Sequence, residues 1–100
     1  LNSLVEGAVI ALRKSIYTIG NPALDQDYVI TFPSVSTSNY MVVGSIESYS
    51  SASGDISGGN RDNDVIWVAR ELTSTRFVLS IREVAANTQN IKFKYMLIKF

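Results

Sequence analysis

The side chains that most often perform catalysis near neutral pH are missing from this chain. It contains no histidine and no cysteine, which excludes imidazole acid–base chemistry, thiolate nucleophiles and disulfides. Its serines therefore have no histidine to activate them, and no G-x-S-x-G turn occurs. Gly58 and Gly59 are adjacent glycines and form no phosphate-binding motif. We expect a protein that is not an enzyme.

Carboxylates are the remaining groups that could act as an acid and a base, as in glycoside cleavage. Nothing in their spacing selects a pair. Solvated charges, or partners for Arg70, Arg76 and Arg82, are the more ordinary interpretation. We predict no catalytic residue and no cofactor among them. The candidate carboxylates, six of the nine in the chain, are Glu47, Asp55, Asp62, Asp64, Glu71 and Glu83.

The run Asp62-Asn63-Asp64 invites a calcium site, because hard cations prefer clustered oxygens. An EF-hand loop would then need glycine and glutamate where this chain has Trp67 and Thr73. A site of another type, built from Asp55, Asn60, Asp62 and Asp64, is one alternative. Turn capping before a strand at Val65 is the other, and we favour it. We therefore expect no metal.

A polar segment interrupts the pattern of the chain from Ser48 to Asp64. Links of this length are uncommon in compact domains, so the segment is either a mobile loop or a functional one. Tyr49 at its start is a candidate exposed aromatic. Trp67 just beyond it either stacks on a sugar or, as is more usual for tryptophan, belongs to the core. The candidate ligand-binding residues are Tyr49, Asn60, Arg61, Asp62, Asp64 and Trp67.

The elements that must hold these residues show a period of two. Apolar and polar residues alternate in several segments that are rich in Val, Ile, Tyr, Phe and Thr, which is typical of strands. In one such segment, Phe77, Leu79 and Ile81 alternate with their neighbours. The pattern predicts six strands, at about Val9–Ile19, Tyr28–Phe32, Tyr40–Tyr49, Val65–Leu72, Arg76–Val84 and Ile91–Phe100.

Turn residues separate these strands. Gly20-Asn21-Pro22 and Pro33-Ser34 end the first two strands, and Thr73-Ser74-Thr75 is short enough for a hairpin. Short links favour antiparallel pairing, and we predict an all-β, six-stranded antiparallel β-sandwich. The domain covers residues 16–100. Residues 1–15 are either its first strand, bent or split near Leu12–Ser15, or the end of a preceding stalk, with a short helix as an alternative for residues 1–12.

The predicted last strand becomes apolar on both faces. Lys92 and Lys94 share a face with Met96 and Ile98, while Phe93, Tyr95 and Leu97 occupy the other. Such a strand is either buried between two sheets or in contact with another subunit. The sequence leaves both interpretations open.

The bulk composition narrows the class of partner. Hydrophobic residues make up 46% of the 100 residues and charged residues 18%, which is typical of a folded domain. Nine basic residues balance nine acidic ones, so nucleic-acid binding is not expected. No apolar run reaches the roughly 18 residues that a bilayer-spanning helix needs, and we expect no membrane insertion.

The chain resembles the C-terminal domains of phage tail fibres and related virion fibres over roughly residues 16–100. Those domains are small β-sandwiches, usually trimeric, and broadly similar to H-type lectins. The resemblance implies a homotrimer at the virion surface, outside the cell, in contact with other virion proteins and with a cell-surface glycan. It is carried by Val29-Ile30-Thr31-Phe32-Pro33, Tyr40-Met41-Val42-Val43-Gly44-Ser45, Asp62-Asn63-Asp64-Val65, Trp67, Phe77-Val78-Leu79, Arg82-Glu83, Thr88-Gln89-Asn90 and Phe93-Lys94-Tyr95.

H-type lectins bind N-acetylgalactosamine at the edges between subunits, commonly with a histidine among the sugar contacts. This chain has no histidine, so that sugar specificity does not carry over. The resemblance implies a fibre or spike tip domain for recognition of a glycan or protein on the host surface. The alternative is a structural trimerisation or attachment domain of a phage head fibre, spike or decoration protein, without a ligand.

Overall fold

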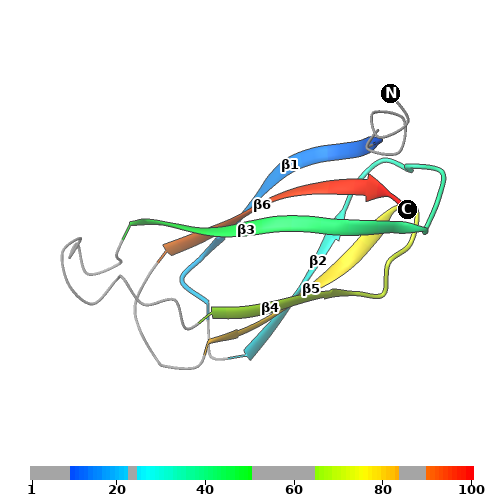
Figure 1. The fold of residues 1–100 in the computed structure, drawn as a ribbon. Helices are drawn as coiled ribbons and strands as arrows, with labels where there is room; N and C mark the ends of the chain where they lie inside the picture. Colours follow the sequence, from blue (N-terminus) through cyan, green and yellow to red (C-terminus); the bar gives the residue numbers. More distant parts are fainter. Residues whose placement is uncertain (1–9, 23–24, 51–64, 84–89) are drawn as a thin grey trace.

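The computed structural model describes residues 10–22, 25–50, 65–83 and 90–100, and within them every regular element is a strand. Two three-stranded antiparallel sheets face each other (Figure 1). Sheet A has the order β1-β6-β3, and sheet B has the order β2-β5-β4. This confirms the predicted six-stranded antiparallel sandwich. The strands are β1 (Ala11–Gly20), β2 (Asp25–Thr31), β3 (Tyr40–Ser50), β4 (Val65–Arg70), β5 (Arg76–Glu83) and β6 (Asn90–Lys99).

All six predicted strands are present, with shifted ends. β2 begins at Asp25, three residues before the predicted start, because Asp25–Asp27 continue the ladder with β5. β4 ends at Arg70 and not at Leu72, because Glu71 adopts a φ of 55° that turns the chain. The expected irregularity in the first strand is a register shift between Ala11 and Arg13. The stalk or helix prediction for the first residues falls mainly on 1–9, outside the described residues.

The strand pairing is mostly long-range. Among the strands that the structure describes, only β4 and β5 are both consecutive in the chain and hydrogen-bonded neighbours. The N–H of Thr73 donates to the carbonyl of Arg76 at 2.8 Å in their connection, in agreement with the predicted hairpin. β6 pairs with β1 and β3, and β5 pairs with β2 and β4. The central strands of the two sheets therefore hold the fold together.

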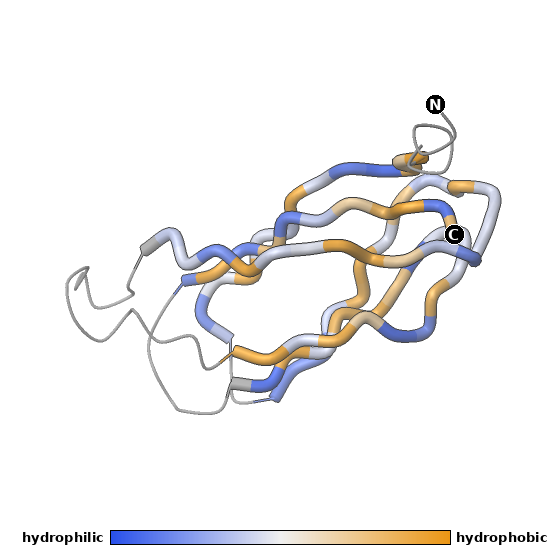
Figure 2. Tube along the Cα trace, in the orientation of Figure 1, coloured by the Kyte–Doolittle hydropathy of each residue, from blue (hydrophilic) through white to orange (hydrophobic). Residues whose placement is uncertain are grey.

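The core lies between the sheets and consists of the inward residues of each strand. Figure 2 shows apolar and polar positions alternating along the chain, as a pleated strand with one buried face requires. Phe93 is central: its ring stacks on Tyr95 and meets the edge of Trp67 at 4.7 Å between centroids. The fully buried side chains are Phe77, Leu79, Ile91, Phe93 and Leu97.

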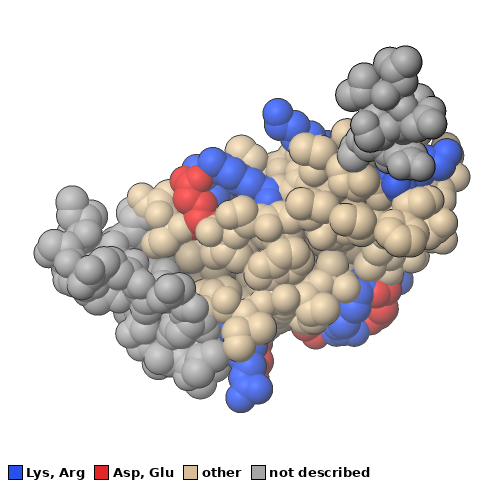
Figure 3. Space-filling model, in the orientation of Figure 1, with Lys and Arg blue, Asp and Glu red and all other residues tan. Residues whose placement is uncertain are grey.

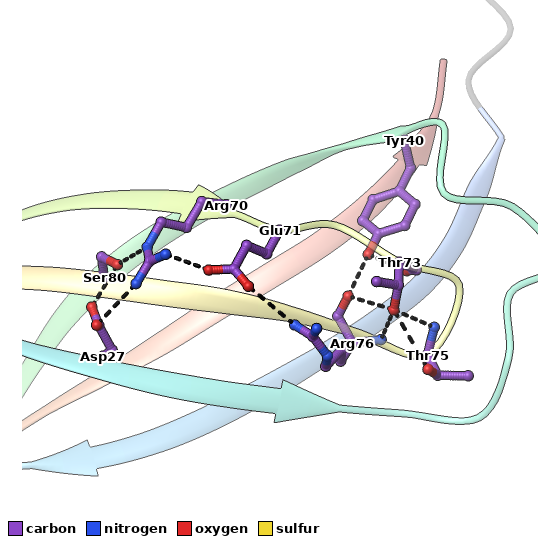
Figure 4. Close-up of polar contacts among 8 residues, drawn as sticks. All are labelled: Asp27, Tyr40, Arg70, Glu71, Thr73, Thr75, Arg76 and Ser80. Atoms are coloured by element: carbon purple, nitrogen blue, oxygen red, sulfur yellow. Dashed lines mark hydrogen bonds and ion pairs between the residues drawn. The ribbon is translucent and has the colours of Figure 1, made fainter.

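One hydroxyl ties the two sheets together at the end of the sandwich where β3 begins. Tyr40, the first residue of β3, is buried, and burial raises the pKa of its hydroxyl. Its oxygen lies 2.7 Å from the carbonyl of Thr73 and 3.1 Å from the carbonyl of Arg76 (Figure 4). The Tyr40 hydroxyl thus donates from sheet A to the β4–β5 hairpin of sheet B.

Candidate ligand-binding site

A polar cluster occupies one end of the outer face of sheet A. The register places Lys92 of β6 opposite Glu47 of β3, and Lys94 opposite Ser45. These side chains point away from the core because Ile91, Phe93 and Tyr95, with which they alternate, are buried. Tyr49 follows Glu47 on the same face near the end of β3. We call Glu47, Tyr49, Lys92 and Lys94 the Tyr49 cluster.

Ion pairs hold the Tyr49 cluster together. The carboxylate of Glu47 lies 2.5 Å from the ammonium of Lys94 and 3.5 Å from that of Lys92. The pKa of the Glu47 carboxyl is lower than usual, and the hydrogen bond from Lys94 is the largest cause of that shift. Lys92 also lies over the Tyr49 ring, 5.3 Å from its centroid. Figure 3 shows acidic and basic side chains gathered over this end of sheet A.

The Tyr49 ring is available to a ligand, since the residue is 45% exposed. An aromatic face with a nearby carboxylate and ammonium offers stacking together with hydrogen-bond acceptors and donors. That combination suits a hydroxyl-rich ligand such as a sugar, or a polar segment of a protein. The ladder between β3 and β6 fixes the backbone of Glu47, Lys92 and Lys94, so these residues have little order to gain on binding. Tyr49 lies at an irregularity of that ladder, between Ser48 and Ser50.

The predicted site residues have different positions. Tyr49 is exposed, as expected. Trp67 is on the inward face of β4 and packs against Phe93, which is the core alternative considered for it. Asn60, Arg61, Asp62 and Asp64, and with them the calcium alternative, lie outside the described residues.

The partners of Tyr49 were not predicted as site residues. The sequence does indicate that Lys92 and Lys94 share one outward face, because they alternate with apolar residues that are buried. Their contact with Glu47 depends on the pairing of β3 with β6. β3 ends at Ser50 and β6 begins at Asn90, 40 residues later in the sequence, and no local pattern indicates that pairing.

Beyond the Tyr49 cluster, the outer face of sheet A is mainly apolar, although Lys14, Thr18 and Ser45 also lie on it. We call its apolar part the apolar half. It adjoins the Tyr49 cluster and forms a shallow hollow of about 870 Å³, whose lining includes Ile16, Val43 and Met96 together with Lys14 and Lys94. The second apolar face of the last strand is therefore not covered by the chain's own other sheet. The apolar half consists of Ile16, Met41, Val43, Met96 and Ile98.

The outer face of sheet B carries a different polar network, which joins three strands. Asp27 of β2 accepts hydrogen bonds from Ser80 of β5 at 2.6 Å and from Arg70 of β4 at 2.9 Å (Figure 4). Arg70 also donates to Ser80 and to Glu71, and Glu71 reaches Arg76. Because these charges satisfy one another, the network is suited to fixing the strand register.

Two further features concern the part of the chain that the structure describes. Its His, Cys, Asp and Glu side chains form no group of three or more that could hold a metal ion. None of its residues forms a helix long and apolar enough to cross a membrane.

Comparisons with known proteins give no match for this chain among protein-family models, curated proteins or solved structures.

Proposed function

We propose that this chain is a binding domain at the tip of a virion fibre or spike, and that it recognises a glycan or protein on the host surface. The main support for recognition is the exposed Tyr49 ring. The ammonium of Lys92 lies over this ring and pairs with the Glu47 carboxylate. The fibre part of the proposal rests on the resemblance of the strand and turn pattern to virion fibre domains.

The position of the Tyr49 cluster supports this proposal. It lies where β3 reaches Ser50 and β6 begins at Asn90, whereas Ile10 and Phe100 lie at the opposite end of sheet A. A domain held at the Ile10 end would present Tyr49 at its far end (Figure 1). A single aromatic site of this kind binds weakly, and several copies on one virion would add avidity.

The test is binding to host cells or to purified surface glycans. Tyr49→Ala removes the stacking face, and we expect about tenfold weaker binding, because an exposed aromatic at the centre of a small site carries much of its binding free energy. Glu47→Gln removes the negative charge of the carboxylate, and we expect it to weaken binding as well. Alanine at Asn60, Arg61 and Asp62 tests the adjoining polar segment separately.

Phe100→Ala is the matched control, since Phe100 is an aromatic residue that is 80% exposed and far from Tyr49. It should leave binding unchanged, and all variants should melt at the temperature of the unaltered chain. Undiminished binding by the Tyr49→Ala/Glu47→Gln double variant would show that the Tyr49 cluster is not the recognition site.

A second candidate function is structural: trimerisation or attachment within a head fibre, spike or decoration protein, without a ligand. The apolar half of sheet A favours it, because exposed apolar patches on small domains mark contacts with other proteins. A broad glycan panel and host cells that both fail to bind the assembled protein would favour this candidate over recognition.

A further inference from the structure

The outer edge of β3 presents a row of backbone groups that have no partner in the described part of the chain. β3 is an edge strand of sheet A and pairs with β6 on one side (Figure 1). The N–H of Phe100 donates to the carbonyl of Asn39 at 3.1 Å. In an antiparallel ladder, every second residue from Asn39 therefore bonds to β6, and the residues between direct their N–H and C=O groups away from it. These edge-directed residues are Tyr40, Val42, Gly44, Ile46 and Ser48.

The other three edges carry features that hinder pairing with a further strand. Proteins usually protect edge strands by short length, irregular register or charge. β1 has register shifts after Ala11 and Thr18, and the guanidinium of Arg13 lies over the buried Phe32 ring, 5.5 Å from its centroid. β2 and β4 are only seven and six residues long. β3 is eleven residues long and keeps one register over residues 40–48, so it is the most open of the four described edges.

The inward side chains of β3 are also incompletely covered. Val42 and Ile46 pack against the core but are only half-buried, whereas Phe93 and Leu97 of the central strand β6 are fully buried. The difference arises because β3 has a neighbouring strand on one side only. A strand added at this edge would cover Val42 and Ile46 and would also bond to the edge-directed backbone groups.

We infer that the β3 strand of a second copy of this chain occupies this edge, antiparallel to the first. The edge-directed residues are distributed symmetrically about Gly44. Two copies therefore use all of these residues when Gly44 lies on the two-fold axis between them, as in an isologous dimer. Val42 then lies opposite Ile46 of the partner subunit, which forms an apolar pair on the inward side. The two copies of sheet A become one continuous sheet.

The first test is sedimentation of variants with a damaged β3 edge. Val42→Pro removes one edge-directed N–H and leaves the hydrogen bonds to β6, because proline is tolerated on an edge strand where its nitrogen faces away from the neighbouring strand. Ile46→Lys places an inward charge at the same edge. We expect the unaltered chain to sediment at twice its 11.0 kDa mass and both variants to sediment at half the mass of that dimer.

Ile16→Pro is the matched control on the opposite edge of sheet A. The backbone groups of β6 alternate between its two neighbours, so Ser15 and Tyr17 of β1 bond to it and the N–H of Ile16 points outward. This variant should remain a dimer, and circular dichroism should show the same sheet content in all three variants. A monomeric unaltered chain would overturn the inference. So would a trimer, because pairing between like edges closes at two copies, or a dimer that survives both changes in β3.

The second test reads the register directly, since the chain has no cysteine of its own. Pairing about Gly44 places Val43 opposite Ser45 of the partner subunit, with Cα atoms about 4.5 Å apart, which a disulfide can bridge. An equal mixture of Val43→Cys and Ser45→Cys should form a disulfide-linked dimer on mild oxidation. Either variant alone should form little, because like residues then lie about 7–8 Å apart on the diagonal. A mixture without the cross-link would contradict the inferred pairing.

The inference does not rest on the ligand proposal, and the two can fail separately. The monomeric Val42→Pro variant keeps the outward side chains of Glu47, Tyr49, Lys92 and Lys94. Binding of a glycan to that monomer reports on the Tyr49 cluster, whereas sedimentation and the cross-link report on the contact between copies.

Discussion

Asp27 shows how one carboxylate can hold three strands in register. It lies on β2 and accepts hydrogen bonds from Ser80 of β5 and from Arg70 of β4. The Ser80 hydrogen bond is the largest influence on Asp27, and with Arg70 it holds the pKa of the carboxyl below its ordinary value of 3.8. The ionised form is therefore favoured more strongly in the folded chain than in the unfolded chain.

Because the pKa of Asp27 is lowered by folding, the free energy of unfolding depends on pH. The contribution is fully present above the pKa of the unfolded chain and is lost as the pH falls through the lower pKa of the folded chain. Asp27→Asn removes the titrating group, so we expect the variant to be less stable at neutral pH and to lose less of its stability below about pH 4. Urea unfolding at a series of pH values measures both effects.

Asp25→Asn is the control for Asp27. Asp25 is on the same strand, and its one ion pair within the described part of the chain is with Arg82, at 4.0 Å between two highly exposed side chains. Its substitution should change stability little at neutral pH. If Asp27→Asn and the unaltered chain lose stability in parallel as the pH falls, Asp27 does not have the coupling that its contacts indicate.

Gly44 is a second position where a single added atom, a Cβ, is expected to change stability. It lies on the inward side of β3, and a Cβ there would overlap the ring of Phe93, which is fully buried. Gly44→Ala should therefore lower the free energy of unfolding by about 1–3 kcal/mol through overpacking. Ser45→Ala, one residue further and outward, should change it by less than about 0.5 kcal/mol. Equal stability of the two variants in chemical denaturation would contradict this account of the core.

At the scale of the elements, Tyr40 links the β4–β5 hairpin to sheet A. Tyr40→Phe keeps the ring and removes the hydroxyl that donates to the carbonyls of Thr73 and Arg76. Because the half-buried carbonyl of Thr73 then loses this donor, we expect a loss of about 1–2 kcal/mol in the free energy of unfolding. Tyr49→Phe removes a hydroxyl from an exposed residue and should leave the free energy unchanged. Equal losses in the two variants would mean that the Tyr40 contacts contribute nothing.

The elements were largely predictable because the chain alternates along its strands. Phe77, Leu79 and Ile81 are buried in β5, as their spacing indicates. Asp25–Asp27 of β2 were missed, since a polar strand end on an edge carries no apolar period. The positive φ of Glu71 was missed as well, because nothing in that residue type indicates a turn.

The site was less predictable than the fold, for a physical reason. Tyr49 was predicted as a candidate from its place beside a polar segment, and the structure shows that it is exposed. Its contacts with Lys92 and, through Lys92, with Glu47 depend on a pairing between distant strands, which periodicity does not reveal. The core position of Trp67 was one of two interpretations, and only the opposing sheet decides between them by placing Phe93 against the indole.

At the scale of the whole molecule, the sandwich has two distinct faces and two distinct ends. Sheet A combines the Tyr49 cluster with the apolar half, and sheet B combines an ion-pair network with exposed aliphatic residues. The N–H of Lys99 donates to the carbonyl of Ile10 at 2.9 Å, so β1 begins where β6 ends. The Tyr49 cluster is at the other end, and the body between is 48 Å in its longest extent.

This arrangement determines how the domain would respond to mechanical load. A pull between a receptor held at Tyr49 and a tether at Ile10 runs parallel to the strands of sheet A. The ladder hydrogen bonds lie across that direction, so they are sheared together and share the force. A pull that separates Ile10 from Phe100 would instead peel β1 from β6 one bond at a time. The same sheet would resist the first pull far better than the second.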